Sequence, residues 1–154
     1  SFINFLEGDT TASDTLIMYF TKRNSDLQIV FQIKNSNKYF EIANKNLLEL
    51  NFSQFQIDSI DYESIRAIHN QTKLTYCPTS EVVKDLEKLK NEKKHPTTLL
   101  FHFIHIRPVS EPLYSAYTKL NENKLATITK VLDDSDKFIE YRDVNIVCPN
   151  RCPY

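Results

Sequence analysis

Gly8 is the only glycine in this chain of 154 residues, and this shortage restricts what the chain can build. Average protein composition, about 7% glycine, would give roughly ten or eleven. Phosphate-binding loops and dinucleotide fingerprints need several closely spaced glycines, because the backbone there turns tightly and approaches the ligand. These residues therefore contain no P-loop, no dinucleotide fingerprint and no glycine-rich kinase loop, and their turns must be built from other residues.

The remaining composition is that of a globular domain with a substantial core. Hydrophobic residues make up 41% of the chain, and ten Phe and eight Tyr provide bulky side chains in the absence of Trp. The 19 basic and 20 acidic residues give a formal net charge of −1, which provides no overall attraction to nucleic acid or anionic lipid. No apolar run reaches the length of a transmembrane helix.

The first third of the chain has the pattern of an antiparallel β-meander. Residues 15–22, 27–34 and 38–43 are rich in β-branched and aromatic residues. In 27–34, apolar residues alternate with polar ones, which predicts a strand with one core face and one wet face. Asn, Asp and Ser fill the turns between these segments, and Asn tolerates the positive φ that glycine usually supplies. Residues 2–6 are a candidate for a further strand.

Two helices are predicted in the middle of the chain. The first spans about Tyr62 to Asn70, where apolar residues recur at helical spacing. The second follows Pro78 and has an apolar stripe over residues 82–89, with lysines near its end that suit the helix dipole. Residues 73–77 between the two helices fit either a strand or a loop.

The last third adds further strands. Residues 99–106 are bulky on both faces, which predicts a central strand covered on both sides. Residues 114–120 fit either a helix or a strand that turns into 124–132, and residues 137–148 alternate as a strand does. We therefore expect an α+β fold: a meander, two helices and further strands, with the helices packed on one face of the sheet.

The cysteines are Cys77, Cys148 and Cys152, an odd number that cannot form a self-contained disulfide framework. Cys148 and Cys152 lie beside prolines and fit half of a zinc site, a short disulfide or a free tail. A zinc site needs four ligands, and the second pair is missing. We therefore predict no metal site and no cofactor, a single domain over residues 1–147, and a Cys- and Pro-containing tail over 148–154.

His105 and Arg107 form the first candidate binding pair. Strand alternation places them on one face, opposite His102, so the two histidines cannot hold one metal ion together. His105 and Arg107 together would suit a phosphate or a carboxylate. A structural role in a packed sheet is the favoured alternative, since structural histidines are often perturbed.

Gln28, Gln32 and Lys34 form the second candidate binding surface, on the polar face of the strand at 27–34. Two N-glycosylation sequons begin at Asn51 and Asn70. We expect Phe52 in the first sequon to be buried, which argues against a glycan there.

No set of residues in the sequence points to catalysis, so an enzyme is not favoured. The leading hypothesis is a non-catalytic protein–protein interaction domain, acting as a subunit or module of a larger assembly, with strand edges available to a protein partner. The first alternative is a secreted or cell-surface binding protein with a disulfide and N-glycans. The second is an enzyme or polyanion binder that uses His105 and Arg107. An intracellular location is favoured over secretion.

Overall fold

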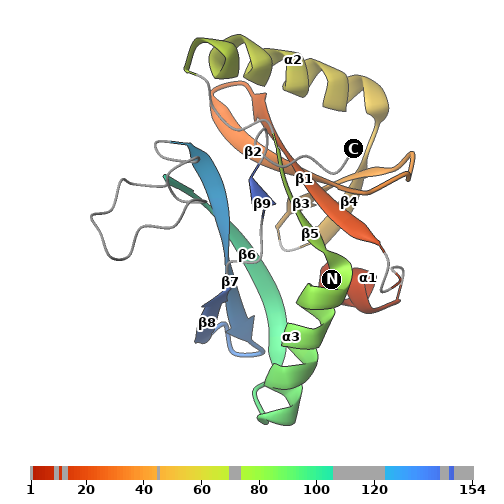
Figure 1. The fold of residues 1–154 in the computed structure, drawn as a ribbon, viewed down its shortest axis with the longest axis vertical. Coiled ribbons are helices and arrows are strands. Elements are labelled where there is room, and N and C mark those ends of the chain that lie inside the picture. The colour runs from red at the N-terminus through yellow and green to blue at the C-terminus, as the bar shows by residue number, and fades with distance from the viewer. Residues whose placement is uncertain are drawn as a thin grey trace.

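A computed structural model describes residues 2–8, 11, 14–44, 46–69, 74–105, 124–142 and 146–147. Within these ranges the chain has an α+β fold with antiparallel sheets, as the sequence predicts (Figure 1). The helices are α1 Phe2–Gly8, α2 Phe52–His69 and α3 Thr79–Asn91. The strands are β1 Thr15–Arg23, β2 Asp26–Ile33, β3 Tyr39–Ala43, β4 Asn46–Leu50, β5 Leu74–Pro78, β6 Pro96–His105, β7 Leu125–Asp133, β8 Phe138–Arg142 and β9 Ile146–Val147.

The described strands form two sheets. The larger has six strands in the order β4-β3-β2-β1-β5-β9, and the smaller has three in the order β6-β7-β8. Strands β1 to β4 pair antiparallel with their neighbours in the chain, so the predicted meander is confirmed. Strand β1 is central, because β2 pairs with one of its edges and β5 with the other.

The turns of the meander are built without glycine. Asn24, Asn35 and Asn44 follow β1, β2 and β3, and each has a positive φ; Asp136 does the same between β7 and β8. Asn and Asp tolerate this conformation better than other residues with a side chain. The expectation that polar residues replace glycine in the turns is therefore confirmed.

Both faces of the six-stranded sheet are covered. Leu16, Met18 and Phe31 face α1, α3 and the three-stranded sheet and form the main core with them. The opposite face lies beneath α2, where the ring centroids of Tyr19 and Phe55 are 5.1 Å apart. Helices α1 and α3 therefore pack on one face of the sheet and α2 on the other, so the two predicted helices cover opposite faces.

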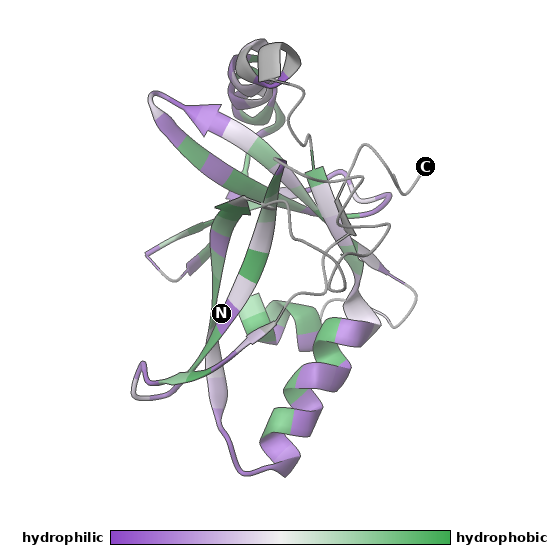
Figure 2. Ribbon diagram, turned by 60° about the vertical axis from the view of Figure 1, so that its left-hand side comes forward, coloured by the Kyte–Doolittle hydropathy of each residue, from purple (hydrophilic) through white to green (hydrophobic). Residues whose placement is uncertain are grey.

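Aromatic rings join the layers of the main core. Phe2 of α1, Phe31 of β2 and Phe101 of β6 lie 4.7 to 5.5 Å apart, centroid to centroid. Hydrophobic and hydrophilic residues alternate along the strands and along α3 (Figure 2). Each of these elements therefore has an apolar side to bury and a polar side for solvent.

Two helical predictions need correction. Residues 2–6 belong to α1 and not to a strand, because Phe2, Ile3 and Leu6 have helical spacing and all three are buried in the core. Helix α2 begins at Phe52, well before the predicted start at Tyr62. The Asn51 side chain accepts a hydrogen bond from the Gln54 N–H at 2.8 Å, as expected for a residue that caps a helix N-terminus.

Several strand predictions also change. Strand β6 is an edge strand in the described sheet and not a central one. The segment 137–148 does not form one strand, since β8 pairs with β7 and β9 pairs with β5 in the other sheet. Residues 74–78 form a strand, so of the two alternatives for residues 73–77, a strand or a loop, the strand is confirmed. Residues 114–120 lie outside the described residues.

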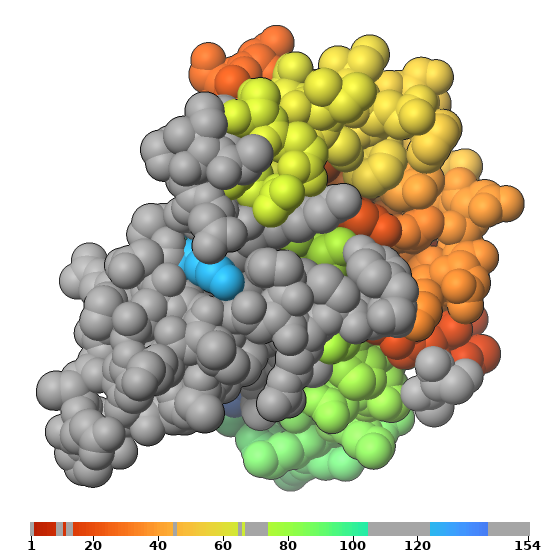
Figure 3. Space-filling view, turned by 45° about the horizontal axis from the view of Figure 1, so that its top comes forward, coloured from red at the N-terminus to blue at the C-terminus, as the bar shows by residue number. Residues whose placement is uncertain are grey.

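The outer side of α2 exposes large apolar side chains at Phe52, Ile57 and Ile60. Figure 3 shows this helix, in yellow, at the molecular surface beside β3 and β4. Phe52 is 53% exposed, so the expectation that it is buried, and with it the argument against a glycan at Asn51, is wrong.

None of the helices in the described ranges has both the length and the hydropathy needed to cross a membrane.

Candidate functional site: a groove along β6

One edge of β6 has no strand partner in the part of the chain that the structure describes. This strand pairs with β7 from Pro96 to His105, and no described strand pairs with its other edge. In an antiparallel ladder, about half of the N–H and C=O groups of an edge strand point away from its neighbour. Those of β6 point toward a groove.

The larger part of this groove has a volume of about 420 Å³. One wall is β6 at residues 99–103, and the opposite wall consists of residues 27–29 of β2 and 41–43 of β3. A second cavity of about 210 Å³ continues it along residues 97–100, where Phe2 and Ile3 of α1 form the far wall. The two parts share lining residues of β3 and β6, and together we call them the β6 groove.

The groove opens where two hairpins of the six-stranded sheet diverge. Strands β2 and β3 pair only at Val30–Glu41 and Phe31–Phe40. Beyond these pairs, β2 stays with β1 as far as Asp26, while β3 stays with β4 as far as Ala43. The separation leaves residues 27–29 of β2 and 42–43 of β3 facing the groove without hydrogen-bonded pairing to each other.

The edge of β6 lacks the features that usually prevent unwanted pairing. Natural sheet edges are blocked by charged residues, proline or bulges. Residues 97–104 contain no Lys, Arg, Asp, Glu or Pro, and the only irregularity in the β6–β7 register lies at Pro96. The edge strands β4 and β8 carry Glu49 and Glu140. β6 is therefore the least protected of these three edges.

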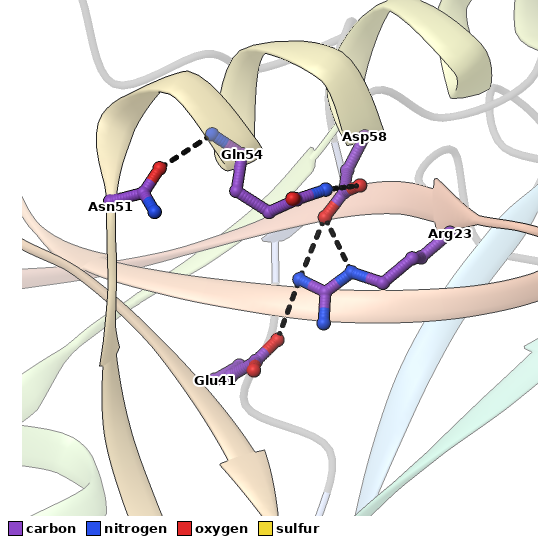
Figure 4. Close-up of polar contacts among 5 residues, drawn as sticks. All are labelled: Arg23, Glu41, Asn51, Gln54 and Asp58. Carbon is purple, nitrogen blue, oxygen red and sulfur yellow. Dashed lines mark hydrogen bonds and ion pairs between the residues drawn. The ribbon is translucent and has the colours of Figure 1, made fainter.

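A network of charged side chains lies at one end of the groove (Figure 4). Arg23 donates to Asp58 Oδ2 from Nε and Nη2, at 3.0 and 2.8 Å, and its Nη2 also contacts Glu41 Oε2 at 2.9 Å. Gln54 Nε2 donates to Asp58 Oδ1 at 2.7 Å. The hydrogen bond to Asp58 raises the pKa of Arg23, and Glu41 contributes to the same effect, while partial burial opposes it.

Two buried polar atoms near this network have no hydrogen-bond partner among the described residues. They are Gln28 Oε1 and Thr21 Oγ1, on residues that face each other across the β1–β2 ladder. Gln28 also lines the groove. A buried acceptor without a donor is costly, so Gln28 Oε1 is a group beside the groove that needs a donor.

The predicted polar face of β2 is only partly a surface. Gln28 lines the groove, but Gln32 is buried, accepts a hydrogen bond from the Tyr19 hydroxyl at 2.9 Å and donates one to the Ser36 carbonyl. Lys34 donates its backbone N–H to Thr15. The expectation of a wet face is wrong because α2 covers this side of the sheet. Whether Gln28, Gln32 and Lys34 bind a partner stays a prediction.

The other predicted residues are placed only in part. His102 is exposed and lines the groove, and the backbone of His105 ends β6. The His105 side chain, Arg107, Cys148 and Cys152 lie outside the described residues, so the roles predicted for them stay predictions. In the described part of the chain, no three His, Cys, Asp or Glu side chains gather as metal ligands do.

The groove could not be predicted from the sequence, because its walls come from separate parts of the chain. The only local signal was the long uncharged run over residues 99–106, which a central strand explains equally well. The chain matches no family model, no curated protein and no solved structure.

Proposed function

We propose that the protein is a non-catalytic interaction module that binds an extended segment of a partner polypeptide as an added strand along β6. The observation that carries this proposal is the unprotected edge of β6 inside the β6 groove. Strand addition satisfies the free backbone groups of an edge, and pockets beside the edge select the side chains of the bound segment.

The dimensions of the groove suit one extended segment. The groove follows β6 over residues 97–103, and a strand rises about 3.3 Å per residue, so about six residues would span roughly 20 Å. Alternate side chains of this segment would point inward, toward Leu27 and Ile29. The intervening side chains would lie beside Leu100 and His102, on the opposite side of the sheet.

The occupant that fits is a single segment rather than the sheet edge of a second copy. The edge of β6 faces residues 27–29, residues 41–43 and α1 across the groove. In a second folded copy the edge of β6 lies behind the same walls, so these walls would prevent the two β6 edges from pairing. An unpaired extended segment meets no such obstacle.

A random heptapeptide library displayed on phage tests this proposal. We expect the wild-type protein to enrich peptides with apolar residues at alternate positions, and synthetic versions to bind in calorimetry. Leu100→Lys should weaken binding at least tenfold, because a charge in the groove protects the edge. The matched control is Leu48→Lys, on the exposed face of edge strand β4, which should bind as the wild type does.

The backbone supplies a second measurement. Bound peptide should slow amide hydrogen exchange within residues 97–103. Two further peptides carry N-methyl groups at alternate positions, one on the odd residues and one on the even residues. Only the peptide whose methylated N–H groups would face β6 should lose binding. Failure to enrich any peptide, or equal binding by the Leu100→Lys and Leu48→Lys proteins, would overturn the proposal. Thermal melting of both variants verifies that they are folded.

A further inference from the structure

We infer that the segment bound in the β6 groove carries a Lys or Arg side chain that contacts Glu41. This inference rests on the proposed function and specifies the chemistry of the partner. The observation behind it is the charge balance at the polar end of the groove, where one guanidinium serves two carboxylates.

Asp58 is the main ion-pair partner of Arg23. Its side chain is 1% exposed, and a buried carboxylate requires a cation and hydrogen bonds. Arg23 meets that requirement with two hydrogen bonds to one Asp58 oxygen, whereas it makes a single contact with Glu41. One guanidinium therefore serves two carboxylates, and the negative charge that Arg23 does not balance lies at Glu41.

Glu41 is the carboxylate that a ligand can reach. Its side chain is 20% exposed, and it lines the groove, which Asp58 does not. The other polar residues of this larger cavity are Arg23, Gln28 and His102. Among them, the positive charge of Arg23 is balanced by Asp58, and Gln28 has a buried acceptor without a donor among the described residues.

A cationic side chain matches the chemistry of each of these two groups. An ammonium or guanidinium has several N–H donors and a charge opposite to that of Glu41, and hydrogen bonds between charged partners are stronger than neutral ones. The apolar residues around the groove, such as Leu27 and Ile42, lower the local dielectric constant and strengthen this attraction. The segment should therefore combine alternating apolar residues with one basic residue at a fixed position.

The test uses the peptides selected on the wild-type protein. We expect Lys or Arg at one fixed position, and we expect its replacement by norleucine to weaken binding about tenfold or more, the size of a charge-assisted hydrogen bond. Glu41→Gln should cause a similar loss, and the two changes together should cost little more than either alone, because they remove the same contact.

Glu49→Gln is the matched control, since Glu49 pairs with Lys38 at 3.2 Å on β4, outside the residues that line the groove. It should leave both affinity and the preference for a basic residue unchanged. Selected peptides that bind without a basic residue at a fixed position would overturn this inference and leave strand addition intact. A complete absence of binding peptides would instead count against the proposed function. If the losses of binding free energy caused by norleucine and by Glu41→Gln add up in the double change, the proposed contact between the basic residue and Glu41 is also overturned.

Discussion

Arg23 and Asp58 join the end of β1 to the middle of α2 through two hydrogen bonds that meet on one carboxylate oxygen. They lie 35 residues apart in the sequence. The Asp58 side chain is almost fully buried, while the Arg23 side chain is 29% exposed. This contact therefore fixes the position of α2 on the sheet and keeps its own charge close to solvent.

Asp58→Asn should destabilise the protein more than Glu41→Gln. The first change removes the charge of a buried group and replaces one acceptor oxygen by an NH2 donor, so it weakens or loses hydrogen bonds to a charged group that contribute about 1.5–3 kcal/mol each. The second removes a partly exposed ion pair, which contributes about 1 kcal/mol or less. Urea unfolding monitored by circular dichroism gives both free energies, and equal losses would contradict the assignment of Asp58 as the main partner of Arg23.

Cys77 should be inert to thiol reagents in the native protein. Burial raises the pKa of its thiol to about 12, and the charge of Glu81 adds to the effect, so almost no thiolate exists at pH 8. A variant with Cys148→Ser and Cys152→Ser isolates this residue. We expect labelling by iodoacetamide at pH 8 to be at least tenfold slower in buffer than in denaturant, and equal rates would contradict its burial.

Tyr62 should make the protein lose stability at alkaline pH. Burial raises the pKa of its hydroxyl from about 10 to about 12 in the folded state. The folded state then holds the proton more tightly than the unfolded state, so this contribution is complete below pH 10 and is lost as the pH rises toward 12. In Tyr62→Phe, unfolding free energies should fall less between pH 10 and 12, whereas the exposed Tyr141→Phe control should follow the wild type.

Lys93→Gly should stabilise the protein by about 0.5–1 kcal/mol. Lys93 follows α3 with a φ of 59°, and its N–H donates to the Lys90 carbonyl. A residue with a side chain is strained in this left-handed conformation, and glycine is not. Lys84→Gly, at an exposed interior position of the same helix, should instead cost about 1 kcal/mol. Chemical denaturation compares the two, and a loss of stability in both would contradict the role of the conformation.

The sequence predicted the meander well because its strands are local and their alternation is clear. The first half of α2 escaped prediction for a physical reason. Its buried side includes Phe55, Asp58 and Tyr62, while Ile57 and Ile60 are exposed. A buried carboxylate on one side and apolar residues on the other obscure the helical pattern, and only the partner Arg23, distant in sequence, explains why Asp58 is there.

The position of β6 in its sheet was not predictable from its own residues. Leu99 and Phe101 are apolar because they contact the core, and Leu100 because it lines the groove. A strand covered on both faces in the centre of a sheet would have the same composition. The difference depends on where β2 and β3 separate, which no short segment of the sequence records.

The order of strands in the larger sheet also sets an order of assembly during synthesis. Strands β1 to β4 are complete once residue 50 has been made, and each pairs with its neighbour through a short turn. The second partner of β1 is β5, which ends only at Pro78. Until α2 and β5 have been synthesised, one edge of the central strand has no β5 to pair with, and an unpaired edge is prone to strand pairing with other chains.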